Sequence, residues 1–205
     1  MKVSLTDAGK RFNRDWIFRH FTYTFETGQS YAITGPNGSG KSTLLQVLSG
    51  AMMLNEGTIG FSIENRQISI ENIYQHVSIC APYLEVIEEM TLKEFLEFHS
   101  GFKPFLPGIT TDIIISALGL ENASSKQIRY YSSGMRQRVK LAQAVFSDAE
   151  IILLDEPCTN LDTEGIDLYH QLIDEYCENR LLVVSSNDIV EYKFCNEILN
   201  ILKYK

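Results

Sequence analysis

The feature that most constrains the fold is the eight-residue segment Gly35–Ser42, which reads Gly-Pro-Asn-Gly-Ser-Gly-Lys-Ser. It fits the pattern G-x-x-x-x-G-K-[S/T] of a phosphate-binding loop. An apolar run, Ser30 to Thr34, precedes it and predicts a buried strand, while the spacing after it predicts a helix over Ser42 to Ser49. A glycine-rich turn that merely contains a lysine is the alternative. That alternative leaves the flanking strand and helix unexplained, so we predict a strand–loop–helix unit that binds phosphate.

Each residue type in this loop has a physical reason to bind a nucleotide. Glycines let successive backbone N–H groups turn toward one centre, and the helix N-terminus adds a positive field. We expect Lys41 to reach the β- and γ-phosphates of ATP, Ser42 to ligate Mg²⁺, and Thr43 to contact the α-phosphate. The full set of predicted loop ligands is Gly35, Pro36, Asn37, Gly38, Ser39, Gly40, Lys41, Ser42 and Thr43.

The rest of the chain predicts an α/β domain with a central, mostly parallel sheet. Apolar runs at Ile151 to Leu154 and Leu181 to Ser185 have the character of buried parallel strands, and Gly134 to Phe146 has helical spacing. Aromatic residues alternate over Phe21 to Phe25, which predicts a half-buried strand. With Gly57 to Phe61 this strand is expected to form an antiparallel N-terminal layer. Helical patterns from about Met90 to Lys126 indicate a helical insertion, and nothing in the chain divides 1–205 into separate domains.

Composition argues against several classes of function. The formal net charge of −8 makes nucleic acid an unfavourable partner. The four cysteines lie far apart without a Cys-x-x-Cys pair, so we expect reduced thiols rather than disulfides or a zinc site. We expect no secretory signal, and the apolar runs are far shorter than the roughly 20 residues that cross a bilayer. Any role at a membrane is therefore expected to come through a partner.

A second acidic site follows the strand at Ile151 to Leu154, where Asp155 and Glu156 come directly before a proline. A buried strand delivers its C-terminal residues to the edge where α/β sheets bind ligands. We expect Asp155 to hold Mg²⁺ through water and Glu156 to orient the water that attacks the γ-phosphate. Two solvated acids that end a strand are the alternative.

The segment Tyr131–Arg138, reading Tyr-Ser-Ser-Gly-Met-Arg-Gln-Arg, lies between the two sites, and Thr159-Asn160-Leu161-Asp162 follows the second. This order of motifs resembles the ATP-binding subunits of ABC transporters, whose signature reads Leu-Ser-Gly-Gly-Gln. The resemblance covers essentially the whole chain. It implies the ABC type of P-loop NTPase fold, with a helical subdomain over about 84–133 inserted in a single domain, 1–205.

The resemblance also implies an assembly in which two such domains, identical or different, pack head to tail. Ser132 and Gly134 would then meet the γ-phosphate held by the partner, although Ser132 is equally a good helix N-cap. Asp162 would bridge the two sites, and Phe12, with Trp16 as the alternative, would stack on adenine. A multi-span membrane permease would dock near Tyr83 to Phe98. The chain would lie on the cytoplasmic face of the membrane.

Three departures from the family pattern bear on activity. Ser133 and Met135 replace a glycine and a glutamine of the signature. In the family, a glutamine links Mg²⁺ to the permease contact, and the region Ile79 to Glu85 lacks it. Gln75 lies too early in the chain to serve and is expected to be exposed. We expect Pro82 or Tyr83 to occupy the position of that glutamine. Asn187 stands where the family has a switch histidine, and an amide cannot carry a proton charge. We therefore expect slow hydrolysis, with an N-cap role as the alternative for Asn187.

Other functions fit less of the sequence. A soluble ABC-type ATPase acting on ribosomes or DNA fits poorly with the acidity and with the single domain. A phosphate-loop kinase explains neither Tyr131 to Met135 nor Thr159 to Asp162. A partly degenerate nucleotide sensor is consistent with Asn187 and the missing glutamine. The leading prediction is the ATP-hydrolysing motor subunit of a transporter, whose cargo and direction the motifs do not specify.

Overall fold

The computed structural model describes residues 1–205, which form two compact units. The first, here called the sheet unit, comprises Met1–Ile79, Glu150–Glu156 and Asn179–Lys205. The second, the helical unit, comprises Cys80–Ala149 and Pro157–Glu178. No helix in the structure combines the length and the apolar character that crossing a membrane requires.

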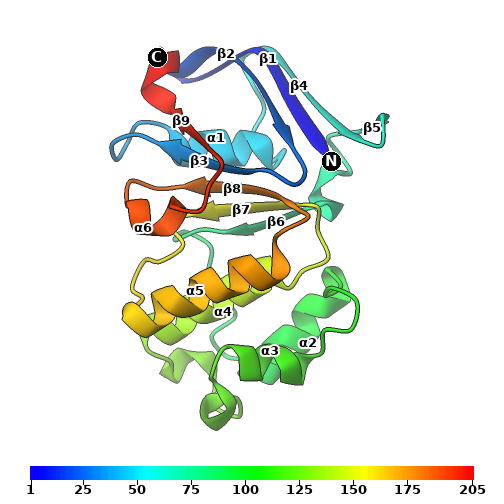
Figure 1. The fold of residues 1–205 in the computed structure, drawn as a ribbon, viewed down its shortest axis with the longest axis vertical. Helices are drawn as coiled ribbons and strands as arrows, with labels where there is room; N and C mark the ends of the chain where they lie inside the picture. Colours follow the sequence, from blue (N-terminus) through cyan, green and yellow to red (C-terminus); the bar gives the residue numbers. More distant parts are fainter. The chain divides into compact units, whose positions relative to one another are not determined.

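An antiparallel sheet forms one layer of the sheet unit (Figure 1). Phe21 and Phe25 are fully buried and the intervening Tyr23 is half-buried, which confirms the strand predicted from the alternating aromatics. Residues 58 to 61 pair antiparallel with the first strand, which places the segment Gly57 to Phe61 in this layer, as predicted. In the order β2-β1-β4-β5, the strands are β1 (Lys2–Phe12), β2 (Asp15–Glu26), β4 (Glu56–Ile63) and β5 (Arg66–Ile68).

The second layer is a five-stranded sheet in the order β6-β7-β8-β3-β9. The pairs β7–β8, β8–β3 and β3–β9 are parallel, which confirms the predicted central sheet. Every residue of β7 and β8 is buried, as expected for strands covered on both faces. The strands are β3 (Ser30–Thr34), β6 (Val77–Cys80), β7 (Ile151–Asp155), β8 (Leu181–Ser185) and β9 (Glu197–Asn200).

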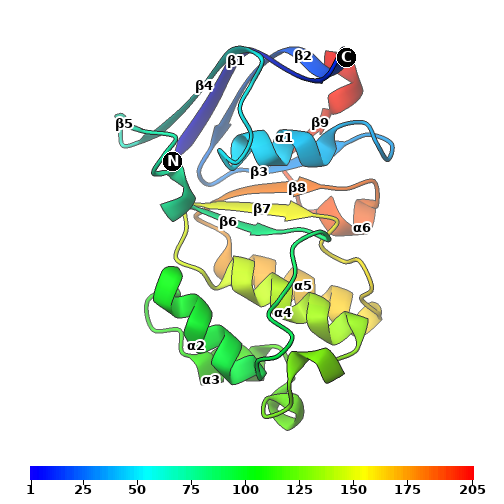
Figure 2. The ribbon, with the colours of Figure 1, turned by 180° about the vertical axis from the view of Figure 1, so that it is seen from behind.

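Helix α1 (Lys41–Leu48) lies between the two sheets (Figures 1 and 2). Its apolar residues Leu44, Leu45, Val47 and Leu48 are buried in a core shared with β1, β2, β3, β7 and β8. This packing fixes the helix, which begins at Lys41, inside the predicted loop segment Gly35–Ser42. The short helices of this unit are α6 (Ile189–Tyr192) and the 3₁₀ turns η1 (Ile73–Gln75) and η4 (Ile201–Tyr204).

The helical unit confirms the helical character predicted for residues 90 to 126. Thr91 and Glu94 form a reciprocal capping box at the start of its first helix. Helices α4 and α5 run side by side in both views (Figures 1 and 2). The elements are α2 (Leu92–Phe102), α3 (Thr111–Ala117), η2 (Glu121–Ala123), η3 (Ile128–Tyr130), α4 (Ser133–Val145) and α5 (Thr163–Tyr176).

Candidate active site

A hollow of about 220 Å³ opens at the predicted phosphate loop, where it also meets Glu156. Two parts of the predicted site, far apart in the sequence, therefore lie together in the sheet unit. The hollow is lined by Ile17, Asn37, Gly38, Ser39, Gly40, Lys41, Ser42, Thr43 and Glu156.

The loop conformation explains why glycine stands at both of its ends. Gly35 has φ +148, and a Cβ there would lie 2.8 Å from the Ser39 hydroxyl oxygen. Gly40 has φ +106, and a Cβ there would come within 2.2 Å of Ile17 Cγ2. Any larger residue at either position combines a left-handed backbone with a steric overlap. Gly40 immediately precedes α1, whose first N–H groups have no side-chain cap and so remain available to an anion.

The Lys41 side chain is buried within this loop. Its exposed fraction is 5%, and its ammonium group donates a 2.8 Å hydrogen bond to the carbonyl oxygen of Gly35. A buried ammonium is costly unless its hydrogen bonds are satisfied. Phosphate oxygens offer it a stronger, charge-assisted partner than this neutral carbonyl.

Asp155 ends β7 with an exposed fraction of 2%, and its Oδ1 atom has no hydrogen-bond partner. Ser185, its register partner on β8, also carries a buried hydroxyl without a partner. Unsatisfied buried oxygens are uncommon and call for an explanation. Hydrated Mg²⁺ takes oxygen ligands, and the unpartnered Asp155 carboxylate and the Ser42 hydroxyl of the hollow are both of the chemical type that this ion takes.

Glu156 is half-buried and adopts φ +45, a left-handed conformation that is unusual for glutamate. Its backbone N–H donates a 2.9 Å hydrogen bond to the carbonyl oxygen of Ser185. Backbone outliers of this kind concentrate at functional sites, where the surrounding structure holds them in place. The outlier therefore supports a functional role for this carboxylate.

Asn187 contacts the phosphate loop from the loop after β8. Its Oδ1 atom accepts a 3.3 Å hydrogen bond from the backbone N–H of Gly35, and its Nδ2 donates at 3.0 Å to Asn37 Oδ1. The alternative interpretation of Asn187 as a helix N-cap is wrong. Asp188 fills that role, since its side chain accepts a hydrogen bond from the backbone N–H of Val190 at the start of α6.

The two aromatic candidates for adenine do not line the hollow. Phe12 is 47% exposed at the end of β1, with the Lys10 ammonium 5.4 Å from its ring centroid. The guanidinium groups of Arg11 and Arg19 both lie over the Trp16 ring. Because its ring already carries these contacts, Trp16 is less available for stacking than the exposed Phe12.

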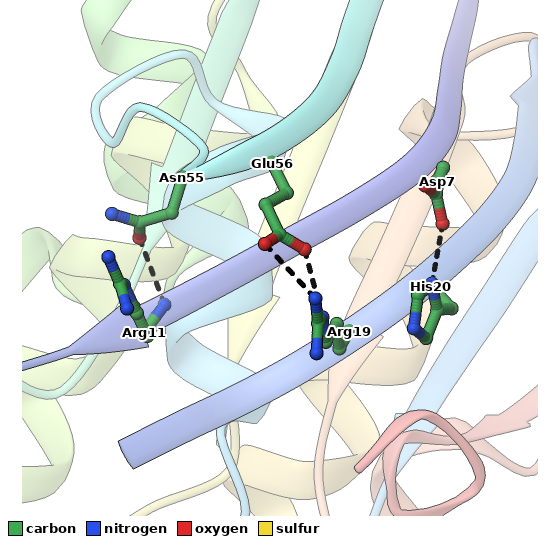
Figure 3. A network of polar contacts seen from close by, with 6 residues as sticks. All are labelled: Asp7, Arg11, Arg19, His20, Asn55 and Glu56. Atoms are coloured by element: carbon green, nitrogen blue, oxygen red, sulfur yellow. Dashed lines mark hydrogen bonds and ion pairs between the residues drawn. The ribbon is translucent and has the colours of Figure 1, made fainter. Parts of the chain in front are cut away.

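A polar network on the antiparallel sheet holds the Arg19 guanidinium and the backbone of Arg11 (Figure 3). Arg19 makes two hydrogen bonds to the Glu56 carboxylate, at 2.9 and 3.1 Å. The backbone N–H of Arg11 donates to Asn55 Oδ1 at 2.9 Å. His20 and Asp7 form a further pair at 2.7 Å between β1 and β2. The network links β1, β2 and the start of β4.

The signature residues line a second hollow, of about 520 Å³, in the helical unit. Ser132 caps α4 by accepting a hydrogen bond from the backbone N–H of Met135 at 3.2 Å, so the N-cap interpretation of Ser132 is confirmed. Asp162 caps α5 through the backbone N–H of Gly165 at 2.9 Å. The lining consists of Gly119, Leu120, Asn122, Ala123, Ser132, Ser133, Gly134, Met135, Arg138, Asn160 and Asp162.

Several residues that line these hollows could not be singled out from the sequence, among them Ile17 and Arg138. Ile17 lines the phosphate-loop hollow from β2, and only its place beside the buried Phe18 marked it as a strand residue. Arg138 lines the second hollow, with Nη2 3.6 Å from Asp162 Oδ1. Its position on α4, one helical turn beyond Gly134, was the available signal.

The loop after β6 contains no glutamine, and Gln75 is exposed before that strand, as predicted. Tyr83 is 48% exposed, and Leu84 and Ile87 are each 37% exposed. A groove of about 400 Å³ runs beside this loop. It is lined by Pro82, Glu85, Val86, Glu88, Ser133, Arg136, Gln137, Lys140 and Asn160.

A phosphate loop between β3 and α1 of a mostly parallel sheet, with acids at the end of β7 in the same sheet, defines a P-loop nucleotide hydrolase. The sequence model of the family described as "ABC transporter" matches residues 18–159. The chain therefore belongs to the ABC transporter family, as one of its ATP-binding subunits. Neither the soluble nor the sensor alternative gains support from these comparisons.

Individual relatives agree with this assignment. The chain is 32% identical over 193 residues to the "Uncharacterized ABC transporter ATP-binding protein YybJ" of Bacillus subtilis, covering 90% of this chain and 85% of that one. It is 27% identical over 206 residues to the "Lantibiotic transport ATP-binding protein SrtF" of Streptococcus pyogenes, covering 98% and 86%. The solved "Dimeric Structure of MJ0796, a Bacterial ABC Transporter Cassette" shares its fold, with a TM-score of 0.81 at 22% identity over 97% of this chain and 94% of that one.

Proposed function

We propose that the hollow at the phosphate loop binds ATP with Mg²⁺ and hydrolyses it to drive a membrane permease. The observation that carries this proposal is the convergence of complementary groups in the sheet unit. Lys41 and Glu156 line one hollow, and Asp155, directly before Glu156, keeps a buried oxygen without a partner. Phosphoryl transfer needs the reacting groups to be positioned and the phosphate charge to be neutralised, and these residues supply both.

Each residue has a distinct role in this proposal. Lys41 exchanges the Gly35 carbonyl for the β- and γ-phosphates, while backbone N–H groups of residues 35 to 43 bind phosphate oxygens. Ser42 and Asp155 hold Mg²⁺, which neutralises phosphate charge when bound. Glu156 orients the attacking water and accepts its proton. The remaining contacts are Thr43 to the α-phosphate, Asn187 to the γ-phosphate and Phe12 to adenine.

The second hollow is proposed to receive the nucleotide held by another ATP-binding domain, identical or different. The Ser132 hydroxyl oxygen accepts the N–H of Met135, which leaves its hydrogen free to donate to a phosphate. Gly134 and the N-terminus of the thirteen-residue α4 add backbone donors. Asp162 is proposed to link the two sites of the pair.

The permease is proposed to dock at residues 83 to 98, on the cytoplasmic face of its membrane. The exposed Tyr83, Leu84 and Ile87 supply apolar surface there, and they lie beside the groove that contains Glu85 and Lys140. An inserted subdomain over about 84–133 within one domain, 1–205, stays a prediction.

Hydrolysis is proposed to be slow because Asn187 cannot carry the charge of a histidine. Replacing it with histidine should raise kcat and make the rate rise as the pH falls toward 6, since imidazole titrates near pH 6.5. The kcat of the wild-type chain and of Asn187→His, measured from pH 6 to 8, tests this point. An unchanged or lower kcat in Asn187→His contradicts it.

Two experiments test the proposed function. ATP hydrolysis by the wild-type chain should be lost in Lys41→Ala, with both proteins equally folded by circular dichroism. A tagged Glu156→Gln chain with MgATP should recover a multi-span protein from detergent-solubilised native membranes. Recovery of ribosomes, or of no membrane protein, would instead favour a soluble ATPase.

A further inference from the structure

The loop that carries Asn187 is itself anchored, so its side chain is presented from a fixed backbone. Ser186 donates its N–H to the carbonyl oxygen of Ile33 at 3.2 Å, which ties the loop to β3. The backbone N–H of Asp188 donates to the Ser186 hydroxyl oxygen at 2.9 Å. The residues on both sides of Asn187 are therefore held within the sheet unit before any nucleotide arrives.

The two ends of the Asn187 amide contact two different residues of the phosphate loop. The N–H of Gly35 is only a donor, so it fixes the carbonyl end of the amide toward Gly35. The amino end is thereby directed to Asn37 Oδ1, 3.0 Å away. One of its two hydrogens is used there, and the second stays available to a ligand.

Gly35 is held on both sides of its backbone. Its carbonyl oxygen accepts the Lys41 ammonium at 2.8 Å, and its N–H donates to Asn187 at 3.3 Å. When phosphates draw Lys41 away from that carbonyl, the contact to Asn187 remains to hold the start of the loop. We call the contacts of Asn187 with Gly35 and Asn37 the loop clamp.

We propose that Asn187 is a positioning residue that holds the phosphate loop in its binding conformation through the loop clamp. Asn187 thereby affects the affinity for ADP as well as for ATP. This inference rests on the proposed function, which gives Asn187 only a contact to the γ-phosphate. A primary amide suits the clamp because it presents an acceptor and a donor side by side. Alanine has neither group, and aspartate would place an acceptor against Asn37 Oδ1.

ADP separates the two roles, because it lacks the γ-phosphate. The test is calorimetric titration of MgADP and MgATP into the wild-type chain and into Asn187→Ala. If the clamp acts, the ADP affinity falls by about 3- to 10-fold for the loss of two modest hydrogen bonds, and the ATP affinity falls at least as much because ATP also loses the γ-phosphate contact. An ADP affinity equal to that of the wild type, beside a weakened ATP affinity, would overturn the inference and leave only the γ-phosphate contact.

A double-mutant cycle and an exchange measurement test the clamp directly. Asn37→Ala should weaken both nucleotides less than Asn187→Ala does, and the double variant should bind like Asn187→Ala alone. Fully additive losses would count against the clamp. In the nucleotide-free chain, hydrogen exchange of the Gly35 amide should be faster in Asn187→Ala, and equal exchange rates would overturn the inference.

Two controls separate failure of the inference from failure of the function. Asn72→Ala removes an exposed asparagine that makes no side-chain cap, and it should bind both nucleotides like the wild type. Lys41→Ala should bind neither nucleotide tightly. If the wild-type chain bound no nucleotide, the proposed function would be wrong. The exchange rate of the Gly35 amide would still show whether the loop clamp forms.

Discussion

The backbone N–H of Glu156 donates a 2.9 Å hydrogen bond to the carbonyl oxygen of Ser185, across the ends of β7 and β8. This bond extends the pairing of the two strands by one residue, although Glu156 itself has left the strand conformation with φ +45. The carboxylate is therefore directed by a backbone that the sheet holds in an unfavourable conformation. Rigid placement of this kind is what a water-orienting residue needs.

Glu156→Gln should abolish most hydrolysis while leaving MgATP binding intact. The amide has nearly the same shape as the carboxylate but cannot accept a proton, so kcat should fall by at least about 10²-fold. Phosphate release and calorimetric binding measure the two quantities. Glu178→Gln, a neutralisation of an exposed glutamate in the helical unit, should leave both unchanged. Loss of binding in Glu156→Gln would mean that this position holds the nucleotide rather than the water.

Gly40→Ala should destabilise the protein, because it adds a Cβ 2.2 Å from Ile17 Cγ2 at φ +106. We expect a loss of roughly 2–4 kcal/mol in the free energy of unfolding, from strain together with overpacking. Urea denaturation of the nucleotide-free protein measures it.

Gly101→Ala is the matched control. Gly101 lies in α2, has no positive φ, and a Cβ there would meet nothing within 4 Å. Alanine should stabilise the helix at this position by roughly 0.5–1 kcal/mol. If both substitutions shifted the free energy of unfolding in the same direction, the steric account of Gly40 would be wrong.

The strands and helices that flank motifs could be predicted from the sequence with small errors at their ends. Four-residue apolar runs located β7 and β8, and the phosphate-loop pattern located β3 and α1. The short edge strand β9 was not predicted. Its four residues, Glu197–Asn200, are all partly or fully exposed, so no buried run or alternation marks it. Its strand conformation depends on pairing with β3, which is distant in sequence.

Motifs could also predict which residues meet at each site, but not which side chains they contact. The phosphate loop and Glu156 do share a hollow, and Ser132, Gly134 and Asp162 share another. The contacts of Asn187 with Gly35 and Asn37 join positions about 150 residues apart. No local pattern encodes such a contact, because it follows from the parallel pairing of β3 with β8.

Ser185→Ala should not destabilise the nucleotide-free protein, in contrast to an ordinary buried serine. Its hydroxyl has no hydrogen-bond partner, so removing it relieves a desolvation cost, and the free energy of unfolding should stay equal or rise by up to about 1 kcal/mol. Ser132→Ala, which removes the cap of α4, should instead cost about 1 kcal/mol. Thermal or urea unfolding of both variants measures these changes. If Ser185→Ala lost as much free energy of unfolding as Ser132→Ala, the Ser185 hydroxyl would have a bound partner.

His99 should make the stability of the protein depend on pH. Burial, reinforced by the nearby Lys103 ammonium, lowers its pKa from 6.5 to about 4. The Ser147 hydroxyl donates to the carbonyl oxygen of Gln143, so the contact of 2.9 Å between Ser147 Oγ and His99 Nε2 requires the ring to donate. Between pH 4 and 6.5 the unfolded chain binds a proton that the folded chain does not, so stability rises with pH through this window.

His99→Gln keeps a hydrogen-bond donor for Ser147 but removes the titration. The wild-type protein should therefore lose more stability than this variant when the pH is lowered from 7.5 to 5. Urea midpoints of both proteins at the two pH values measure the difference, and the other titrating groups cancel in the comparison. Equal losses of stability in the two proteins would show that His99 takes up its proton as readily in the folded chain as in the unfolded one. The surroundings of the ring, formed by Phe95, Phe105 and Ser147, would then not exclude its charged form.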